Sequence, residues 1–136
     1  MMSTVSIRAA LESALNAMTP ALDTAFENVN FAPTAESVPY QMAHVIFARP
    51  DNQEIGRSHQ ELGYLQVKLM YPIRTGSLAA MTRAELLRTT FYRGSTVTSG
   101  GVVVNITDTP EITPSGIEDN RYSVIVKIRF RSFIPT

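Results

Sequence analysis

Few residues in this sequence have the types and spacing that chemistry requires. Histidine occurs twice, at His44 and His59, and cysteine does not occur. Without cysteine the chain has no disulfide, no thiolate zinc ligand and no thiol nucleophile. A zinc site built on two histidines needs a third ligand, and neither histidine has a carboxylate at metal-ligand spacing. We expect His44 to be a packed or edge histidine, and His59 to be a solvated or contact residue of a loop.

The carboxylates also do not form an acid–base pair. Glu54 and Glu61 flank Arg57 in a polar segment, a pattern typical of an exposed loop of mixed charge. No P-loop, dinucleotide or nucleophile-elbow pattern occurs, and Gly100-Gly101 is too short to cradle a phosphate. Three further carboxylates, in a turn-rich stretch, are expected to be solvated: Glu111, Glu118 and Asp119. We therefore predict no catalytic, cofactor or metal site, and a protein that acts by binding other subunits.

Four cations are expected to share one face of a sheet: Lys68, Lys127, Arg129 and Arg131. Such a face is either solvated, or it pairs with acidic residues of a neighbouring subunit, or it binds nucleic acid. Nucleic acid is the least favoured partner because no aromatic residue is expected between these cations. In addition, 12 Lys and Arg balance 12 Asp and Glu, so the chain lacks the excess positive charge typical of a nucleic-acid binder.

Length and composition predict one folded domain over residues 1–136. Apolar residues make up 44% and charged residues 18% of the chain, which disfavours disorder. The first 18 residues contain Arg8, Glu12 and Asn16, so they resemble neither a signal peptide nor a membrane span. We expect a protein that is made in the cytosol.

Two amphipathic helices are predicted. The first covers residues 4–18, where apolar side chains recur at helical spacing: Ile7, Leu11, Leu15 and Met18. The second begins after Ser77, a candidate N-cap, and Gly94 is placed to end it in a left-handed conformation. Its buried stripe is Ala80, Ala84, Leu87 and Phe91.

Alternation and turn residues predict the strands 42–48, 64–71, 95–99, 102–107 and 121–134. Gly100-Gly101 indicates a hairpin turn. Residues 21–27 fit either a short helix or a short strand, 50–63 a long polar loop or hairpin tip, and 108–120 a loop with at most a short edge strand. The fold class is therefore α+β, with two amphipathic helices packed on one mainly antiparallel sheet that carries a long polar loop or hairpin.

The order and spacing of several segments resemble a known family. The run Glu27 to Pro33 follows the first helix, Pro39-Tyr40 opens the first full strand, and Gly63 to Val67 opens the next. That strand ends at Tyr71-Pro72, and the second helix closes with Phe91 and Gly94. In this order the chain resembles the tail terminator and minor tail protein U-like proteins of long-tailed bacteriophages.

The resemblance implies a virion structural protein that assembles as a ring, usually a hexamer, at the head-proximal end of the tail. Such a ring stops polymerisation of the tail tube and offers a surface to a head-completion protein. DNA passes through its channel without sequence-specific binding, and no membrane is involved. The candidate assembly interface consists of the polar loop and the cationic face: Glu54, Arg57, His59, Glu61, Lys68, Lys127, Arg129 and Arg131.

Two alternatives remain open at this point. One is another neck component, such as a head-completion protein, which has a similar size and ring symmetry. The other is a small non-viral ligand-binding α+β domain, with a pocket lined by Tyr40, Phe47 and Tyr71.

Overall fold

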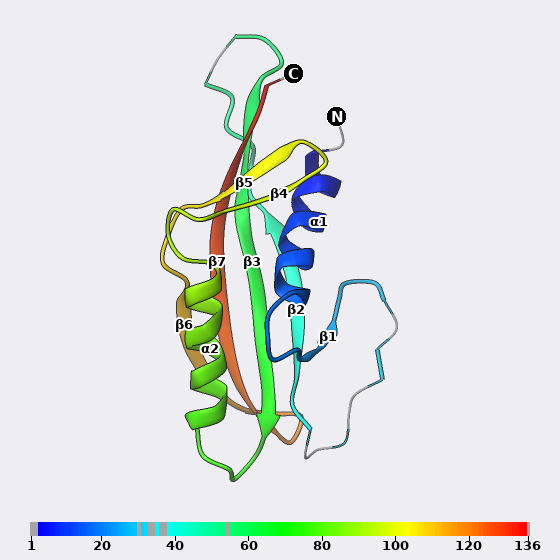
Figure 1. The fold of residues 1–136 in the computed structure, drawn as a ribbon, viewed down its shortest axis with the longest axis vertical. Helices are drawn as coiled ribbons and strands as arrows, with labels where there is room; N and C mark the ends of the chain where they lie inside the picture. Colours follow the sequence, from blue (N-terminus) through cyan, green and yellow to red (C-terminus); the bar gives the residue numbers. More distant parts are fainter. Residues whose placement is uncertain (1–2, 30, 33–34, 36–37, 54, 136) are drawn as a thin grey trace.

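Two long antiparallel strands run through the middle of the fold in the computed structural model (Figure 1). The structure describes residues 3–29, 31–32, 35, 38–53 and 55–135. Its elements are α1 (Ser3–Asn16), β1 (Asp23–Ala25), β2 (Tyr40–Phe47), β3 (His59–Pro72), α2 (Leu78–Thr90), β4 (Thr96–Ser99), β5 (Val102–Ile106), β6 (Glu111–Glu118) and β7 (Arg121–Ile134). The predicted α+β class, with two helices on a mainly antiparallel sheet, is confirmed.

The sheet has the strand order β1-β2-β3-β7-β5-β4, and β6 also pairs with β7. Strands β3 and β7 pair along their whole length, from His59 opposite Ile134 to Pro72 opposite Arg121. On its other edge, β7 pairs with β6 in its first half and with β5 near its end. The pair β1–β2 is parallel, and the other pairs among the described strands are antiparallel.

Both helices lie on the same face of the sheet, which we call the inner face (Figure 1). Ile7, Leu11 and Leu15 of α1 are buried against it, as is Leu87 of α2. Full burial of one such side chain stabilises the fold by about 1.5–3 kcal/mol relative to its exposure. Within the described part of the chain, neither helix has the length and hydropathy needed to cross a membrane. No helix of the described residues lies on the opposite face of the sheet, which we call the outer face.

The predicted helices are present, with two differences at their ends. Helix α1 ends at Asn16, two residues before the predicted end, although Met18 is still buried in the core. Ser77 occupies the N-cap position of α2, as predicted, but its backbone is already helical and its side chain makes no capping hydrogen bond. Gly94 has a positive φ of 92°, as predicted, and its N–H donates to the carbonyl oxygen of Ile106.

Most predicted strands are confirmed, but the structure of the polar segments between them differs from the prediction. Residues 21–27 contain a strand, β1, instead of a helix. The predicted polar loop 50–63 is shorter, because β3 already begins at His59. The described residues 48–53 and 55–58 form what we call the hairpin tip. For residues 108–120 the prediction was a loop with at most a short edge strand, and the structure has a longer strand there, since β6 occupies eight of these residues. Pairing with β7 makes β6 a strand, although its side chains are mostly exposed.

Candidate assembly surface

The four predicted cations lie together on the outer face. Lys68 is directly opposite Ile125 in the β3–β7 ladder, and side chains two residues apart on a strand share a face. Lys68 therefore lies on the same face as Lys127, Arg129 and Arg131, as the alternation predicted. The burial of Val126, Ile128 and Phe130 between them confirms which face of β7 is inner.

Three of these four cations pair with acceptors of their own chain. Arg129 Nη2 lies 3.2 Å from Glu111 Oε2, and Lys68 forms an ion pair with Glu118. Arg131 Nη1 lies 2.7 Å from the side-chain oxygen of Gln60 and 3.8 Å from Asp51. Partly exposed pairs of this kind contribute about 0–1 kcal/mol each to stability. Their main effect is on the surface, which has mixed charge instead of a positive stripe.

An aromatic ring lies between two of the cations, contrary to our expectation. Lys127 Nζ is 5.3 Å and Arg129 Cζ 5.7 Å from the centroid of the Tyr64 ring. Both distances allow a cation–π attraction, which holds the two long side chains over the ring. The sequence analysis missed this contact because Tyr64 and the cations belong to different strands, and only their register brings them together.

Apolar side chains accompany the charges on the outer face. Ile46 lies opposite Tyr64, and Phe133 follows Arg131 on the same side of β7. Val103 lies near Phe133, since the Ser132 hydroxyl donates to the Val103 carbonyl oxygen. All three side chains are exposed in the single chain. Exposed apolar groups among ordered charged groups are typical of a surface that another protein covers.

The predicted interface residues of the polar loop do not form one group. Arg57 is exposed on the hairpin tip, whereas His59 and Glu61 belong to β3. Glu61 is only 6% exposed, and it lies near Ser3 Oγ, at 3.4 Å, and His59 Nε2, at 3.5 Å. The expectation of an exposed Glu61 is therefore wrong, because it points to the start of α1. Glu54 lies outside the described residues.

The sequence analysis also missed a polar cluster at the edge of β2. Glu27 Oε1 accepts a hydrogen bond from the Val45 N–H at 2.7 Å and lies 3.1 Å from Arg8 and 3.5 Å from His44. Burial alone would raise the pKa of Glu27, but the Val45 hydrogen bond and Arg8 outweigh it and lower this pKa. Glu12, also near Arg8, has a raised pKa, mainly because of burial. Glu27 was visible in the sequence only as part of the run before Pro33.

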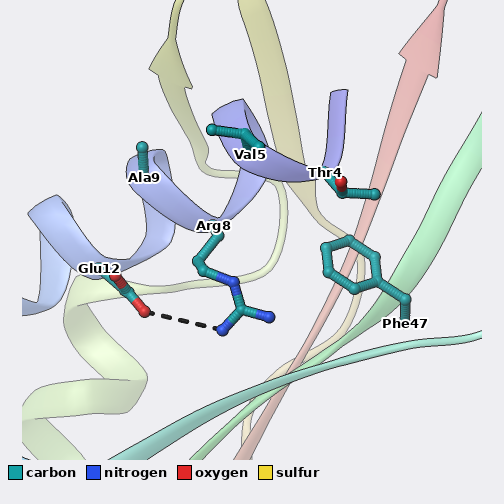
Figure 2. A pocket seen from close by; sticks show the side chains of 6 residues that line it. All are labelled: Thr4, Val5, Arg8, Ala9, Glu12 and Phe47. Carbon is teal, nitrogen blue, oxygen red and sulfur yellow. Dashed lines mark ion pairs between the residues drawn. The ribbon is translucent and has the colours of Figure 1, made fainter. Parts of the chain in front are cut away.

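The described residues form several grooves beside the helices, and two of them contain residues of the predicted ligand pocket. The first, of about 520 Å³, lies between α1 and the end of β2; Figure 2 shows Arg8 with Glu12 and Phe47 among its lining residues. The second, of about 590 Å³, lies beside α2 and includes Tyr71 and Arg83. Tyr40 is buried against Arg121, so Tyr40, Phe47 and Tyr71 do not line one pocket as the ligand-binding alternative required. In the described part of the chain, no three His, Asp or Glu side chains gather in a way that could hold a metal ion.

Over the described residues the chain is an α+β domain whose sheet is covered by helices on one face only. Residues 6–130 match the family described as phage tail terminator protein, and the chain belongs to this family. One solved protein structure is 30% identical to the chain, covers 100% of both chains and superposes with a TM-score of 0.79. No curated protein matches the sequence. The protein is therefore a tail-associated structural protein of a bacteriophage.

Proposed function

We propose that copies of this chain form a ring, a hexamer, that caps the completed tail tube. The ring stops further polymerisation of the tube and presents a surface on which the head is joined. In this proposal the chain acts by binding and not by catalysis, and it resides at the head-proximal end of the tail. Its partners are other copies of itself, the tail tube protein and a head-completion protein.

The observation that carries the proposal is the uncovered outer face. The inner face is closed by α1 and α2, whereas the outer face leaves Ile46, Val103 and Phe133 exposed among fixed charges. A chain of this family that shows such a face in isolation is well suited to bind neighbouring subunits through it. Because a ring requires two different patches to meet, the contact is heterologous and closes by rotation.

The charges of the chain favour passage of DNA without sequence-specific binding. Lys+Arg and Asp+Glu are equal in number, and three cations of the outer face already have an acidic partner in the same chain. A DNA-binding surface would need several unpaired cations to displace counterions from phosphates. We therefore propose that DNA passes through the channel of the ring without sequence-specific binding.

Tube polymerisation tests the function directly. Purified tail tube protein is allowed to elongate, and this protein is added at increasing amounts while tube length is measured by electron microscopy. A terminator stops elongation at about one ring per tube end. A neck component, the alternative within the same particle, would leave tube length unchanged and would bind only tubes that are already closed.

A further inference from the structure

The side of α2 that faces away from the core is built from uncharged residues. They recur at helical spacing: Leu78, Thr82, Leu86 and Thr89. A helix on the surface of a single subunit usually carries charged residues on this side. The charges of α2 lie elsewhere, since Arg83 is buried and Glu85 and Arg88 pair with each other beside this stripe. Leu78 is nevertheless 79% exposed in the single chain, as is typical of a surface that another protein covers.

Two grooves continue this uncharged surface from α2 to the end of α1. The groove of about 590 Å³ beside α2 is lined by Leu78 and Leu86, among others. A smaller groove of about 390 Å³ also includes Leu86 and extends to Ala14 and Met18. Among the described residues that line the two grooves, Arg83 is the only charged one, and it is buried. We call the surface formed by these two grooves the helix-layer surface.

The end of α1 adds a partial negative charge to the helix-layer surface. The last carbonyl groups of a helix carry the negative end of its dipole. A basic side chain in the last turn can offset this charge, but α1 has no basic residue there. Ala17 and Met18, which directly follow α1, line the smaller groove. The helix-layer surface therefore suits a partner that presents apolar groups together with cations.

The outer face of the same chain presents these groups. Val103 is 46% and Phe133 51% exposed there, and Arg129 and Arg131 lie on the same face. The outer face and the helix-layer surface lie on opposite sides of the sheet (Figure 1), so one copy cannot join its own two surfaces. Two different patches on opposite sides of a subunit give a head-to-tail contact that can be repeated around a ring.

We propose that the outer face of one copy packs on the helix-layer surface of the next, with Val103 and Phe133 in the grooves that Leu86 lines. The contact covers the exposed apolar groups of both surfaces. It buries few unpaired charges, because Arg129 and Arg131 have acidic partners in their own chain and the helix-layer surface is uncharged. This inference rests on the ring proposed above and names the second of its two patches.

Chemical cross-linking tests the contact, because the chain has no cysteine of its own. Thr82→Cys places one thiol on the helix-layer surface, and Val103→Cys places one on the outer face; both positions are exposed. A short bismaleimide is added to each variant alone and to their mixture, with and without tail tube. We expect cross-linked dimers in the mixture and none in either variant alone, because like positions of neighbouring copies do not meet in a head-to-tail contact.

Two further samples control this experiment. The double variant Thr82→Cys with Val103→Cys should give a ladder of covalent multimers on a denaturing gel. A mixture of Val103→Cys with Thr109→Cys should give no dimer, since Thr109 is exposed in the loop between β5 and β6 and lines neither groove. Dimers in each single variant alone, or dimers in the Thr109 mixture and not in the Thr82 mixture, would overturn the proposed contact.

A charged substitution measures how much the contact contributes. Thr82→Arg should weaken subunit association about tenfold or more, because it buries a charge without a partner and opposes the cations of the outer face. Thr109→Arg, the same change outside both patches, should leave association within about twofold. Light scattering measures association in solution, and the fraction of capped tube ends measures it on the tube. Thermal unfolding should show both variants as stable as the wild type, and equal association of the two variants would contradict the proposal.

The outcomes separate this contact from the proposed function. A ring that assembles while the mixture of Thr82→Cys and Val103→Cys gives no dimer refutes the contact and leaves the terminator function standing. Cross-linked chains that never close into a ring refute the ring and leave the contact standing. Subunits that neither associate nor cross-link, with tail tube present, refute both.

Discussion

Glu27 closes the edge of β2 by accepting a hydrogen bond from the backbone N–H of Val45 at 2.7 Å. Strand β1 pairs only with Tyr40 to Met42, so the edge of β2 beyond Met42 has no partner strand among the described residues. An uncovered edge offers its N–H and C=O groups to other chains and invites uncontrolled association. In a protein that associates through selected surfaces only, Glu27 protects this edge of β2 from pairing with other chains.

Glu27→Ala should destabilise the isolated subunit by about 1–2 kcal/mol, because it leaves the Val45 N–H without its charged acceptor and Arg8 without its nearer carboxylate. Urea unfolding followed by circular dichroism measures the change. Glu85→Ala is the control: Glu85 is an exposed partner of Arg88 on α2, and its loss should cost less than about 0.5 kcal/mol. Equal losses of unfolding free energy in the two variants would mean that the contact of Glu27 with the edge of β2 does not stabilise the fold.

The same carboxylate should make stability depend on pH. The folded state lowers the pKa of Glu27, so its contribution is fully present above the usual glutamate pKa of about 4.3. That contribution is lost as the pH falls from this value through the lower pKa of the folded state. We expect Glu27→Gln to have a shallower loss of stability below about pH 5 than the wild type. Parallel stability curves between pH 3 and pH 7 would contradict this assignment.

Gly63 is required by a close approach of two strands. A Cβ on Gly63 would collide with the carbonyl oxygen of Ile46 on β2. Gly63→Ala must therefore push β2 and β3 apart near the base of the hairpin tip, at a cost of about 1–3 kcal/mol or more. Gln66→Ala, on the same strand, should be nearly neutral. Thermal unfolding compares the two variants, and an unchanged midpoint for Gly63→Ala would show that the approach is not tight.

The outer face is expected to act in assembly more than in folding. Arg129→Glu with Arg131→Glu replaces the cations that pair with Glu111 and Asp51 and makes this part of the outer face acidic. An acidic partner surface that the cations attract would then be repelled. We expect the variant subunit to fold and to fail in assembly, as seen by size-exclusion chromatography with light scattering. DNA binding, measured at low and moderate salt, should be equally weak in variant and wild type. A large loss of DNA binding in the variant would favour nucleic acid as the partner of this face.

Much of the fold was predictable because single strands and helices carry their own patterns. The alternation of Tyr122 to Phe130 identified β7 and its inner face, and Gly100-Gly101, with φ of 56° and 79°, identified the β4–β5 hairpin. Strand β6 was not predictable. It contains Pro114 and Gly116, most of its side chains are exposed, and only its pairing with β7 makes it a strand.

Less of the candidate surface was predictable, because its contacts join side chains of different strands. Alternation placed the cations of β7 on one face, but their partners Glu111 and Glu118 come from β6, which reads as a loop. Arg83 could have been noticed in the sequence, since it lies three residues after Ala80 and next to Ala84 on the buried stripe of α2. Its hydrogen bond could not have been predicted, since Arg83 Nη1 donates to the carbonyl oxygen of Pro20, which is 63 residues away in the chain.

The most direct test of the proposed function is the assembly state of the protein with its tube. Native mass spectrometry and negative-stain imaging, with and without tail tube, should show a closed ring with a central channel, either in free solution or at the tube end. The proposal predicts six copies and one ring per tube end. A protein that remains a monomer or dimer under all conditions, tube included, would contradict it.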